Sequence, residues 1–119
     1  MNERTLLACL VASLSSVAIW AHAHTAIPVW SPAKGVLCDR FMCASDMGVS
    51  RSLTEKYLGV RTATRLFSKG EFSLTEFTFA NGIFCDVNER LCRMNRYYGA
   101  DGKRSGAISK RYTALLFGN

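Results

Sequence analysis

The residues whose types and spacing most clearly suggest chemistry in this 119-residue chain are its cysteines. Four residues separate Cys38 from Cys43, and six separate Cys85 from Cys92. Thiols can bind zinc or form disulfides, but neither spacing is typical of a zinc site. The chain has five cysteines, and four remain if Cys9 is removed with the N-terminal segment that is interpreted below as a signal peptide. An even number of cysteines in a short exported chain indicates a disulfide framework. We therefore predict two disulfides, no metal site and no cofactor.

Hairpin geometry favours pairing within each pair of cysteines. If the chain turns tightly at Arg40-Phe41 and at Asn88-Glu89, the two cysteines of each pair fall opposite each other. Facing residues on antiparallel strands lie about 5 Å apart, which a disulfide can span. Pairing across the pairs, such as Cys38 with Cys85, would close longer loops and stays the alternative.

Each cysteine pair belongs to a longer motif that occurs twice. Both copies read Gly, a β-branched residue, a large apolar residue, Cys and Asp before the second cysteine. A matching tail follows each copy, Ser50–Gly59 in the first and Ser109–Gly118 in the second. We interpret the chain as a tandem duplication, approximately residues 34–59 and 81–118, of a disulfide hairpin followed by a capped helix.

The first 23 residues have the features of a signal peptide. A basic residue precedes a largely apolar run from Thr5 to Ile19, and Ala21-His22-Ala23 has the small-x-small form of a cleavage site. The run is too short and too rich in serine for a membrane span. We expect cleavage after Ala23, with cleavage after Ala21 as the alternative. A single domain, residues 24–119, would then enter the periplasm without a stable membrane anchor.

Three segments carry helix signals. Ser52-Leu53-Thr54-Glu55 matches a capping box, which predicts a helix that starts there and ends at Gly59. A second short helix is expected over Val60–Lys69. Ser109 is expected to cap the last helix, which ends at Gly118. Each cysteine hairpin is therefore predicted to lead into a short helix.

An antiparallel meander is expected in the second half. Asn81-Gly82 is a strong hairpin signal, since both residues tolerate the positive φ of a type I′ turn. The expected strands are Thr75–Ala80, Ile83–Val87 and Arg90–Tyr97. The predicted fold class is α+β: a small disulfide-stapled domain of two related halves, each a cysteine hairpin with a short helix, plus the meander.

The basic residues are concentrated in the last quarter of the chain. Residues 24–89 contain seven Lys or Arg and seven Asp or Glu, whereas residues 90–119 contain seven basic residues and one acid, Asp101. Such asymmetry indicates an anionic partner, and the alternative is a solvated surface that keeps a small protein soluble. The candidate binding residues in this quarter are Arg93, Arg96, Tyr97, Tyr98, Lys103, Arg104 and Ser105.

Glycines bound the loop that carries two of these cations. Gly99, Gly102 and Gly106 relax its backbone, and nothing apolar within it requires burial. We therefore expect Lys103 and Arg104 to be presented to solvent. Replacing both by serine is expected to leave thermal stability nearly unchanged, because exposed charges contribute little.

No arrangement of residues typical of catalysis is found. The one histidine after the expected signal peptide is His24 at the new N-terminus, and the cysteines are expected to be oxidised. Asp39 and Asp86 occupy equivalent positions of the repeat and could act as paired carboxylates. An aspartate beside a hairpin more often bonds local backbone amides. We predict a protein that is not an enzyme, and export argues against a nucleic-acid partner.

The chain also resembles a known family. The segments that carry the resemblance are Gly82–Asp86, Arg96–Tyr98, Asp101–Gly106 and Leu115–Gly118. They resemble the Fels prophage protein-like family of small YcgJ-like proteins, which enteric and related bacteria export. The resemblance implies a periplasmic location and no established activity. We expect a non-enzymatic interaction module for an anionic or acidic envelope partner; the alternative is a periplasmic inhibitor of an envelope-targeting hydrolase such as lysozyme.

Overall fold

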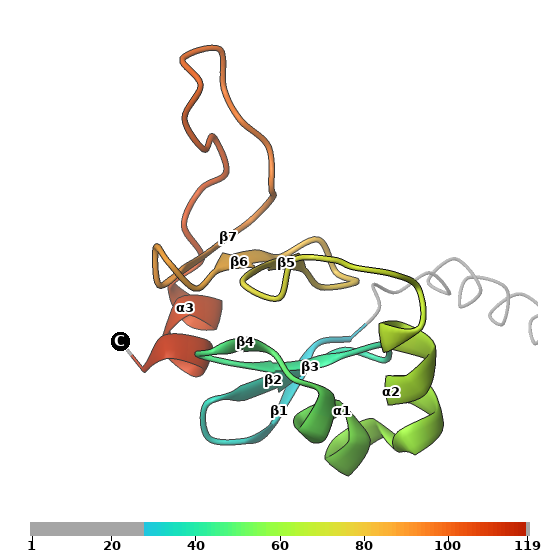
Figure 1. Ribbon diagram of the computed structural model, residues 1–119. Coiled ribbons are helices and arrows are strands. Elements are labelled where there is room, and N and C mark those ends of the chain that lie inside the picture. Colours follow the sequence, from blue (N-terminus) through green and yellow to red (C-terminus); the bar gives the residue numbers. More distant parts are fainter. Residues whose placement is uncertain (1–27, 119) are drawn as a thin grey trace, which may run out of the picture.

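Within residues 28–118, which the computed structural model of the chain describes, seven short strands form two antiparallel sheets beside three helices (Figure 1). The expected signal peptide and His24 lie outside the described residues. The elements in chain order are β1 (Trp30–Ala33), β2 (Val36–Cys38), β3 (Cys43–Ser45), β4 (Gly48–Val49), α1 (Arg51–Leu58), α2 (Val60–Phe67), β5 (Glu76–Thr78), β6 (Phe84–Asp86), β7 (Leu91–Arg93) and α3 (Lys110–Phe117). The predicted α+β class is confirmed.

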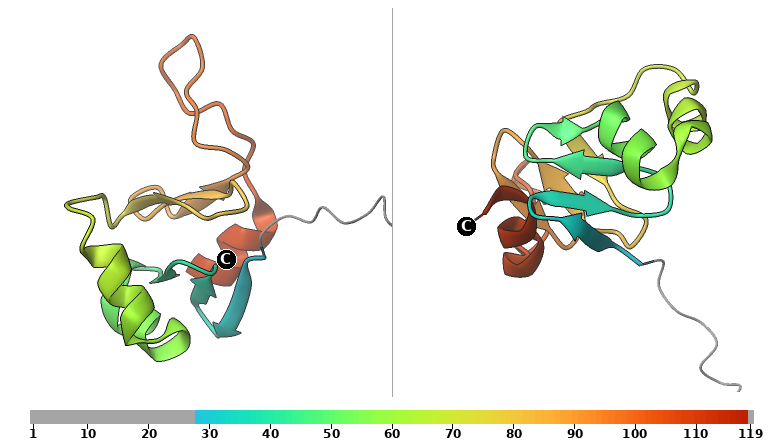
Figure 2. Two further views of the ribbon diagram at one scale, coloured as in Figure 1. Left: turned by 90° about the vertical axis from the view of Figure 1, so that its right-hand side faces the viewer. Right: turned by 90° about the horizontal axis from the view of Figure 1, so that it is seen from below.

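The two sheets face each other. The first has the strand order β1-β2-β3-β4 and the second β5-β6-β7, which is the predicted meander. α3 lies at one side and contacts β7 as well as β2 and β3, and α1 packs under the first sheet (Figure 2). The core between the sheets is formed by Leu37, Met42, Ala44, Val49, Phe77, Phe79, Ile83, Cys85, Cys92, Leu116 and Phe117. Burial of this apolar set is the main stabilising term of the fold.

Alternation along β2 divides its side chains between two cores. Leu37 points into the core between the sheets, whereas its neighbours Val36 and Cys38 pack toward α1. Successive residues of a strand face opposite sides, so one apolar run can supply both layers. The first sheet is therefore buried on both faces, by the second sheet and by α1.

Both disulfides have the predicted pairing. Cys38 is bonded to Cys43, which it faces across β2 and β3. Cys85 is bonded to Cys92, which it faces across β6 and β7. The second hairpin turns in four residues rather than two, with Arg90 in the left-handed region at φ 57°. The register at the cysteines is nevertheless the one that hairpin counting gave.

Two details of the predicted meander are wrong. Gly82 has φ 93°, but Asn81 does not have a positive φ, so the turn is not type I′. Phe79 and Ile83 instead close a three-residue loop through the hydrogen bond from Phe79 N–H to Ile83 O. The third strand ends at Arg93 instead of Tyr97, because the chain leaves the sheet there.

The N-terminus of α1 also differs from the prediction. Ser50, two residues before the expected cap, accepts a hydrogen bond from the N–H of Leu53 at 3.1 Å. Glu55 pairs with Arg51 one turn earlier instead of closing a capping box. Ser109 caps α3 as predicted, accepting from the N–H of Tyr112 at 3.2 Å. The two helices therefore begin at equivalent serines.

Candidate functional site

The two disulfide hairpins are held to their following helices by the same hydrogen bonds. The N–H of Cys43 donates to Oγ1 of Thr54 at 3.0 Å, and the N–H of Cys92 donates to Oγ1 of Thr113 at 2.9 Å. The carbonyl of each of these cysteines accepts from the N–H of the capping serine, at 2.9 and 2.8 Å. Sequence reasoning missed both buried threonines, although each stands four residues after its capping serine. The duplication itself stays a prediction.

The two equivalent aspartates bond backbone amides. Oδ1 of Asp39 accepts from two N–H groups of its own hairpin at 2.8 and 3.0 Å, and Oδ1 of Asp86 does so at 2.8 and 3.3 Å. These are the local bonds typical of an aspartate at a turn. The second oxygen of Asp39 accepts from the N–H of Ala80 at 2.7 Å and so joins the first hairpin to the second sheet.

Beyond β7 the second hairpin continues into a projecting arm, which we define as residues 94–107 (Figures 1 and 2). Backbone hydrogen bonds cross it at three levels, from base to tip: Met94 N–H to Ala107 O at 2.8 Å, Ser105 N–H to Tyr97 O at 3.0 Å and Gly99 N–H to Lys103 O at 2.8 Å. The arm is therefore an ordered, irregular hairpin, not the relaxed polar loop that its glycines suggested.

The arm has a short counterpart in the first unit. There, Ala44 follows the second cysteine and pairs with Val49, which precedes the capping serine. Arg93 and Ile108 occupy the same places in the second unit and also form a bridge. Four residues lie between the paired positions in the first unit, and fourteen lie between them in the second. The arm is therefore a long extension of a connection that is only a short turn in the first unit.

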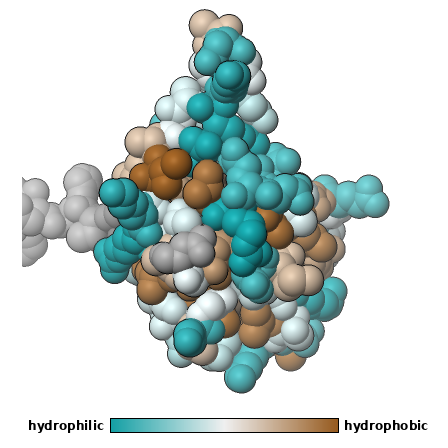
Figure 3. Space-filling view, turned by 90° about the vertical axis from the view of Figure 1, so that its left-hand side faces the viewer, coloured by the Kyte–Doolittle hydropathy of each residue, from teal (hydrophilic) through white to brown (hydrophobic). Residues whose placement is uncertain are grey.

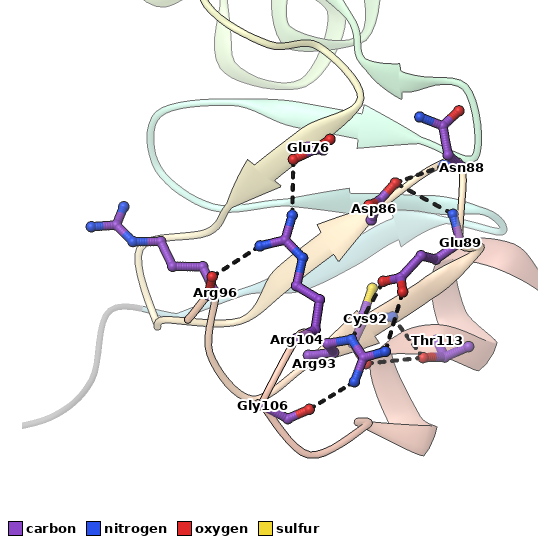
Figure 4. Close-up of polar contacts among 10 residues, drawn as sticks. All are labelled: Glu76, Asp86, Asn88, Glu89, Cys92, Arg93, Arg96, Arg104, Gly106 and Thr113. Carbon is purple, nitrogen blue, oxygen red and sulfur yellow. Dashed lines mark hydrogen bonds and ion pairs between the residues drawn. The ribbon is translucent and has the colours of Figure 1, made fainter. Parts of the chain in front are cut away.

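Arg104 is one of the predicted binding residues, but its guanidinium is held within the molecule (Figure 4). It donates to the carbonyl of Arg96 at 2.9 Å and to Oε1 of Glu76 at 2.9 Å. It also lies over the rings of Phe84 and Tyr98, 4.2 and 4.3 Å from their centroids. The side chain is only 12% exposed. The expectation that Arg104 is a freely presented cation is therefore wrong, and its contacts lead us to expect a loss of stability when it is replaced.

Arg93 is held in a similar way at the base of the arm. Its guanidinium donates to the carbonyl of Gly106 at 2.9 Å and pairs with Glu89 at 3.2 Å, and the side chain is 15% exposed. Gly106 is buried, and a Cβ there would lie 2.5 Å from the carbonyl oxygen of Asn95. The two strands of the arm thus approach closely where Arg93 holds them.

The other predicted binding residues of the arm are exposed. Tyr97 and Tyr98 are 61% and 60% exposed, and Arg96 and Lys103 also reach the surface. Among residues 28–118, no carboxylate lies within ion-pair distance of Arg96 or Lys103. Ser105 is exposed too, but its hydroxyl donates to the carbonyl of Tyr97. Two cations and two tyrosines therefore remain for an external partner.

This surface continues below the arm. Met94 and Ile108 at its base are 55% and 49% exposed, and Lys110 and Arg111 follow in the first turn of α3. Figure 3 shows hydrophilic side chains running from the arm onto the face beneath it. Within the described part of the chain, neither Lys110 nor Arg111 is paired with a carboxylate. The basic character of the last quarter is thus gathered on the arm and at its base.

Residues 28–118 contain no group of three His, Cys, Asp or Glu side chains placed to hold a metal ion. Within the same residues, no helix has the length and apolar character needed to cross a bilayer. The two disulfides are typical of proteins outside the reducing cytoplasm.

The fold and the arm together define a class of protein: a small disulfide-stapled α+β domain that displays a basic, tyrosine-bearing hairpin. The model of the YcgJ protein family matches residues 29–117, and the chain belongs to that family. It is 54% identical over 87 residues to the uncharacterized protein YcgJ of Escherichia coli (strain K12), covering 73% of this chain and 71% of that protein. No solved structure matches the chain. The YcgJ resemblance predicted from the sequence is confirmed.

Proposed function

We propose that this protein is an exported binding protein, not an enzyme, and that the arm contacts an anionic partner in the periplasm. The observation that carries the proposal is the arm itself, a long extension in one unit of a connection that is only a short turn in the other. Loops added to a rigid scaffold are where binding residues concentrate. Here the added segment places Arg96 and Lys103 beside two exposed tyrosines, with Asp101 as its one acid.

The exposed side chains suit a partner of opposite charge. Lysine and arginine at a surface attract an anionic partner and speed its association. This attraction weakens as salt screens the charges. Tyrosine adds contact area at a low cost in side-chain entropy and is enriched in binding surfaces. Arg93 and Arg104 are assigned a structural role instead, since their guanidinium groups are held by carbonyl and carboxylate oxygens inside the molecule.

The test is binding of two anionic probes at low and high ionic strength. One probe is vesicles containing phosphatidylglycerol, and the other is soluble dextran sulfate. Lys103→Ser and Arg96→Ser are expected to weaken binding and to flatten its salt dependence, since fewer charges are screened. Lys34→Ser is the matched control, because Lys34 is an exposed lysine in the β1–β2 turn of the first unit. Equal affinities and salt slopes for arm and control variants would show that the charge is solvated surface.

Inhibition of an envelope-targeting hydrolase is the second candidate function. The projecting shape of the arm favours it, because a narrow hairpin can reach carboxylates at the floor of a cleft (Figure 1). Glycoside hydrolases such as lysozyme carry two such carboxylates. Titration of lysozyme activity with this protein tests the idea. Stoichiometric inhibition that Lys103→Ser relieves would support it, and unchanged activity at excess protein would reject lysozyme as the target.

A further inference from the structure

We propose that Arg104 is the positioning residue of the arm, which it fixes on the outer face of the second sheet so that the exposed cations and tyrosines are presented in one arrangement. The contacts of its guanidinium come from three separate segments. Glu76 lies on β5, Phe84 lies on β6, and Tyr98 lies on the outgoing strand of the arm. One side chain therefore joins the arm to two strands of the sheet. Figure 4 shows its bonds to Glu76 on β5 and to the carbonyl of Arg96.

The place of Arg104 along the arm makes this contact decisive. Below it, the bond between Met94 and Ala107 and the bond from Arg93 to Gly106 hold the base. Among the described residues, the hydrogen bond and ion pair with Glu76 is the polar link between residues 95–105 and the two sheets. Without this link and the contact of Arg104 with Phe84, the outer part of the arm would be ordered by its own cross-strand bonds alone.

The chemistry of the contact requires arginine. A guanidinium is planar, so it can lie against two aromatic rings while its edge donates to a carboxylate and a carbonyl. Lysine has a compact ammonium that cannot make both kinds of contact at once. Phe84 is 4% exposed although it lies on the outer face of the sheet, where the guanidinium covers its ring. Arg104 thus completes the packing of the sheet as well as the position of the arm.

An arm held in place binds with less loss of conformational freedom than an arm that must first be ordered. This step rests on the proposed function, since it assumes that the arm contacts a partner. The position of the arm in the free protein does not depend on that assumption. The two can therefore be measured separately.

The first measurement is amide hydrogen exchange in the full chain without a ligand. Arg104→Lys keeps the charge and is expected to speed exchange of the Ser105 and Gly99 amides by about tenfold or more, through local opening of the arm. The buried Cys43 and Cys92 amides should change by less than about threefold, because their threonine partners are untouched. Glu76→Gln, which removes the carboxylate from the other side, should act in the same direction. Lys103→Gln is the control, and it should leave arm exchange unchanged.

The second measurement is affinity for dextran sulfate. Arg104→Lys should weaken binding by about tenfold without altering net charge, whereas a residue that contributed charge alone would tolerate this change. Unchanged exchange of the arm amides in both Arg104→Lys and Glu76→Gln would overturn the proposal. So would faster exchange with unaltered affinity, provided that Lys103→Gln weakens binding. If Lys103→Gln leaves affinity unaltered as well, the proposed function fails, and the exchange data alone decide whether Arg104 positions the arm.

Discussion

The two cysteine hairpins share their internal hydrogen bonds and differ in what lies between the second cysteine and the capping serine. The first unit crosses that distance in a short turn, at Asp46 and Met47, whereas the second extends into the arm. The shared bonds all involve residues within one unit, so each unit can form them from its own sequence. The added length serves neither disulfide nor helix. A segment that neither the disulfide nor the helix of its unit needs is the first place to look for function.

The hairpins also present opposite faces to the core that they share. Leu37 and Phe84 occupy equivalent positions, but Leu37 lies between the sheets, whereas Phe84 lies on the outer face of the second sheet. Cys85 lies in the core between the sheets, whereas Cys38 packs toward α1. No third sheet covers Phe84 within the described residues, and Arg104 of the arm does so instead. The same local unit therefore has two different surroundings.

The largest effect on stability is expected where the first unit contacts the segment between the units, just before β5. Gly48 has φ 115°, and a Cβ there would collide with the carbonyl oxygen of Leu74, to which the N–H of Val49 also donates. Gly48→Ala should lower the free energy of unfolding by about 3 kcal/mol or more, through backbone strain and overpacking. Gly35→Ala is the control, because Gly35 also has a positive φ (75°) but faces open space. Urea denaturation that gave equal losses for both variants would contradict the steric explanation.

Loss of either disulfide should have the next largest effect. Each closes a short loop, with sequence separations of 5 and 7. The chain-entropy model gives about 2 kcal/mol for loops of this length. We expect the double alanine variant of Cys38 and Cys43 and that of Cys85 and Cys92 to lose similar amounts in thermal or urea unfolding. A difference above about 2 kcal/mol would show that the surroundings, not the shared hairpin, set the contribution of each bond.

The buried threonines test whether the shared bonds contribute equally. Thr54→Val and Thr113→Val keep the shape of the side chain but leave the N–H of Cys43 or Cys92 without its acceptor. An unsatisfied buried amide costs about 1–3 kcal/mol, so each variant should lose an amount in this range. Thr64→Val on the exposed face of α2 is the control. A loss confined to one of the two buried positions would break the equivalence of the units.

The smallest change in stability is expected when the difference between the units is removed. Residues 94–107 can be replaced by Ser-Asp-Met-Gly, the four residues at the corresponding place in the first unit. Closing a shorter loop costs less entropy, and this gain offsets part of the packing that is lost on Phe84. The free energy of unfolding should therefore change by no more than about 1 kcal/mol. Binding of dextran sulfate should be lost. Calorimetry and a binding titration on the same sample would show whether stability and binding separate in this way.

The parts of the fold that could be predicted are those set by residues close in sequence. Hairpin counting placed Cys38 opposite Cys43, and the cap at Ser109 follows from its immediate neighbours. The prediction of a cap at Ser52 was wrong because the position of the cap depends on residues outside the local pattern. The capping-box pattern is local, but Ser50 is selected by bonds to the preceding hairpin through the carbonyl of Cys43. Aligning the two tails, which pairs Ser50 with Ser109, held the information that the local pattern obscured.

The candidate site could be predicted in part. Charge and composition identified the segment that forms the arm, and Tyr97, Tyr98 and Lys103 are exposed on it. That this segment binds a partner stays a prediction. Charge and composition could not distinguish the cations that face solvent from the cations that hold the arm in place. Arg104 is used internally because Glu76 and Phe84, distant in sequence, lie beneath it. No local pattern distinguishes such an arginine from a ligand-binding one.

The pairing of Arg93 with Ile108 has a practical consequence. The equivalent pair in the first unit, Ala44 and Val49, closes a four-residue connection, whereas Arg93 and Ile108 close one of fourteen residues. The preceding hairpin and the following helix are joined by the same hydrogen bonds in both units. That position therefore accepts inserts of very different length without a change in the framework. Foreign peptides could be grafted between these two residues and displayed on a small disulfide-stabilised scaffold.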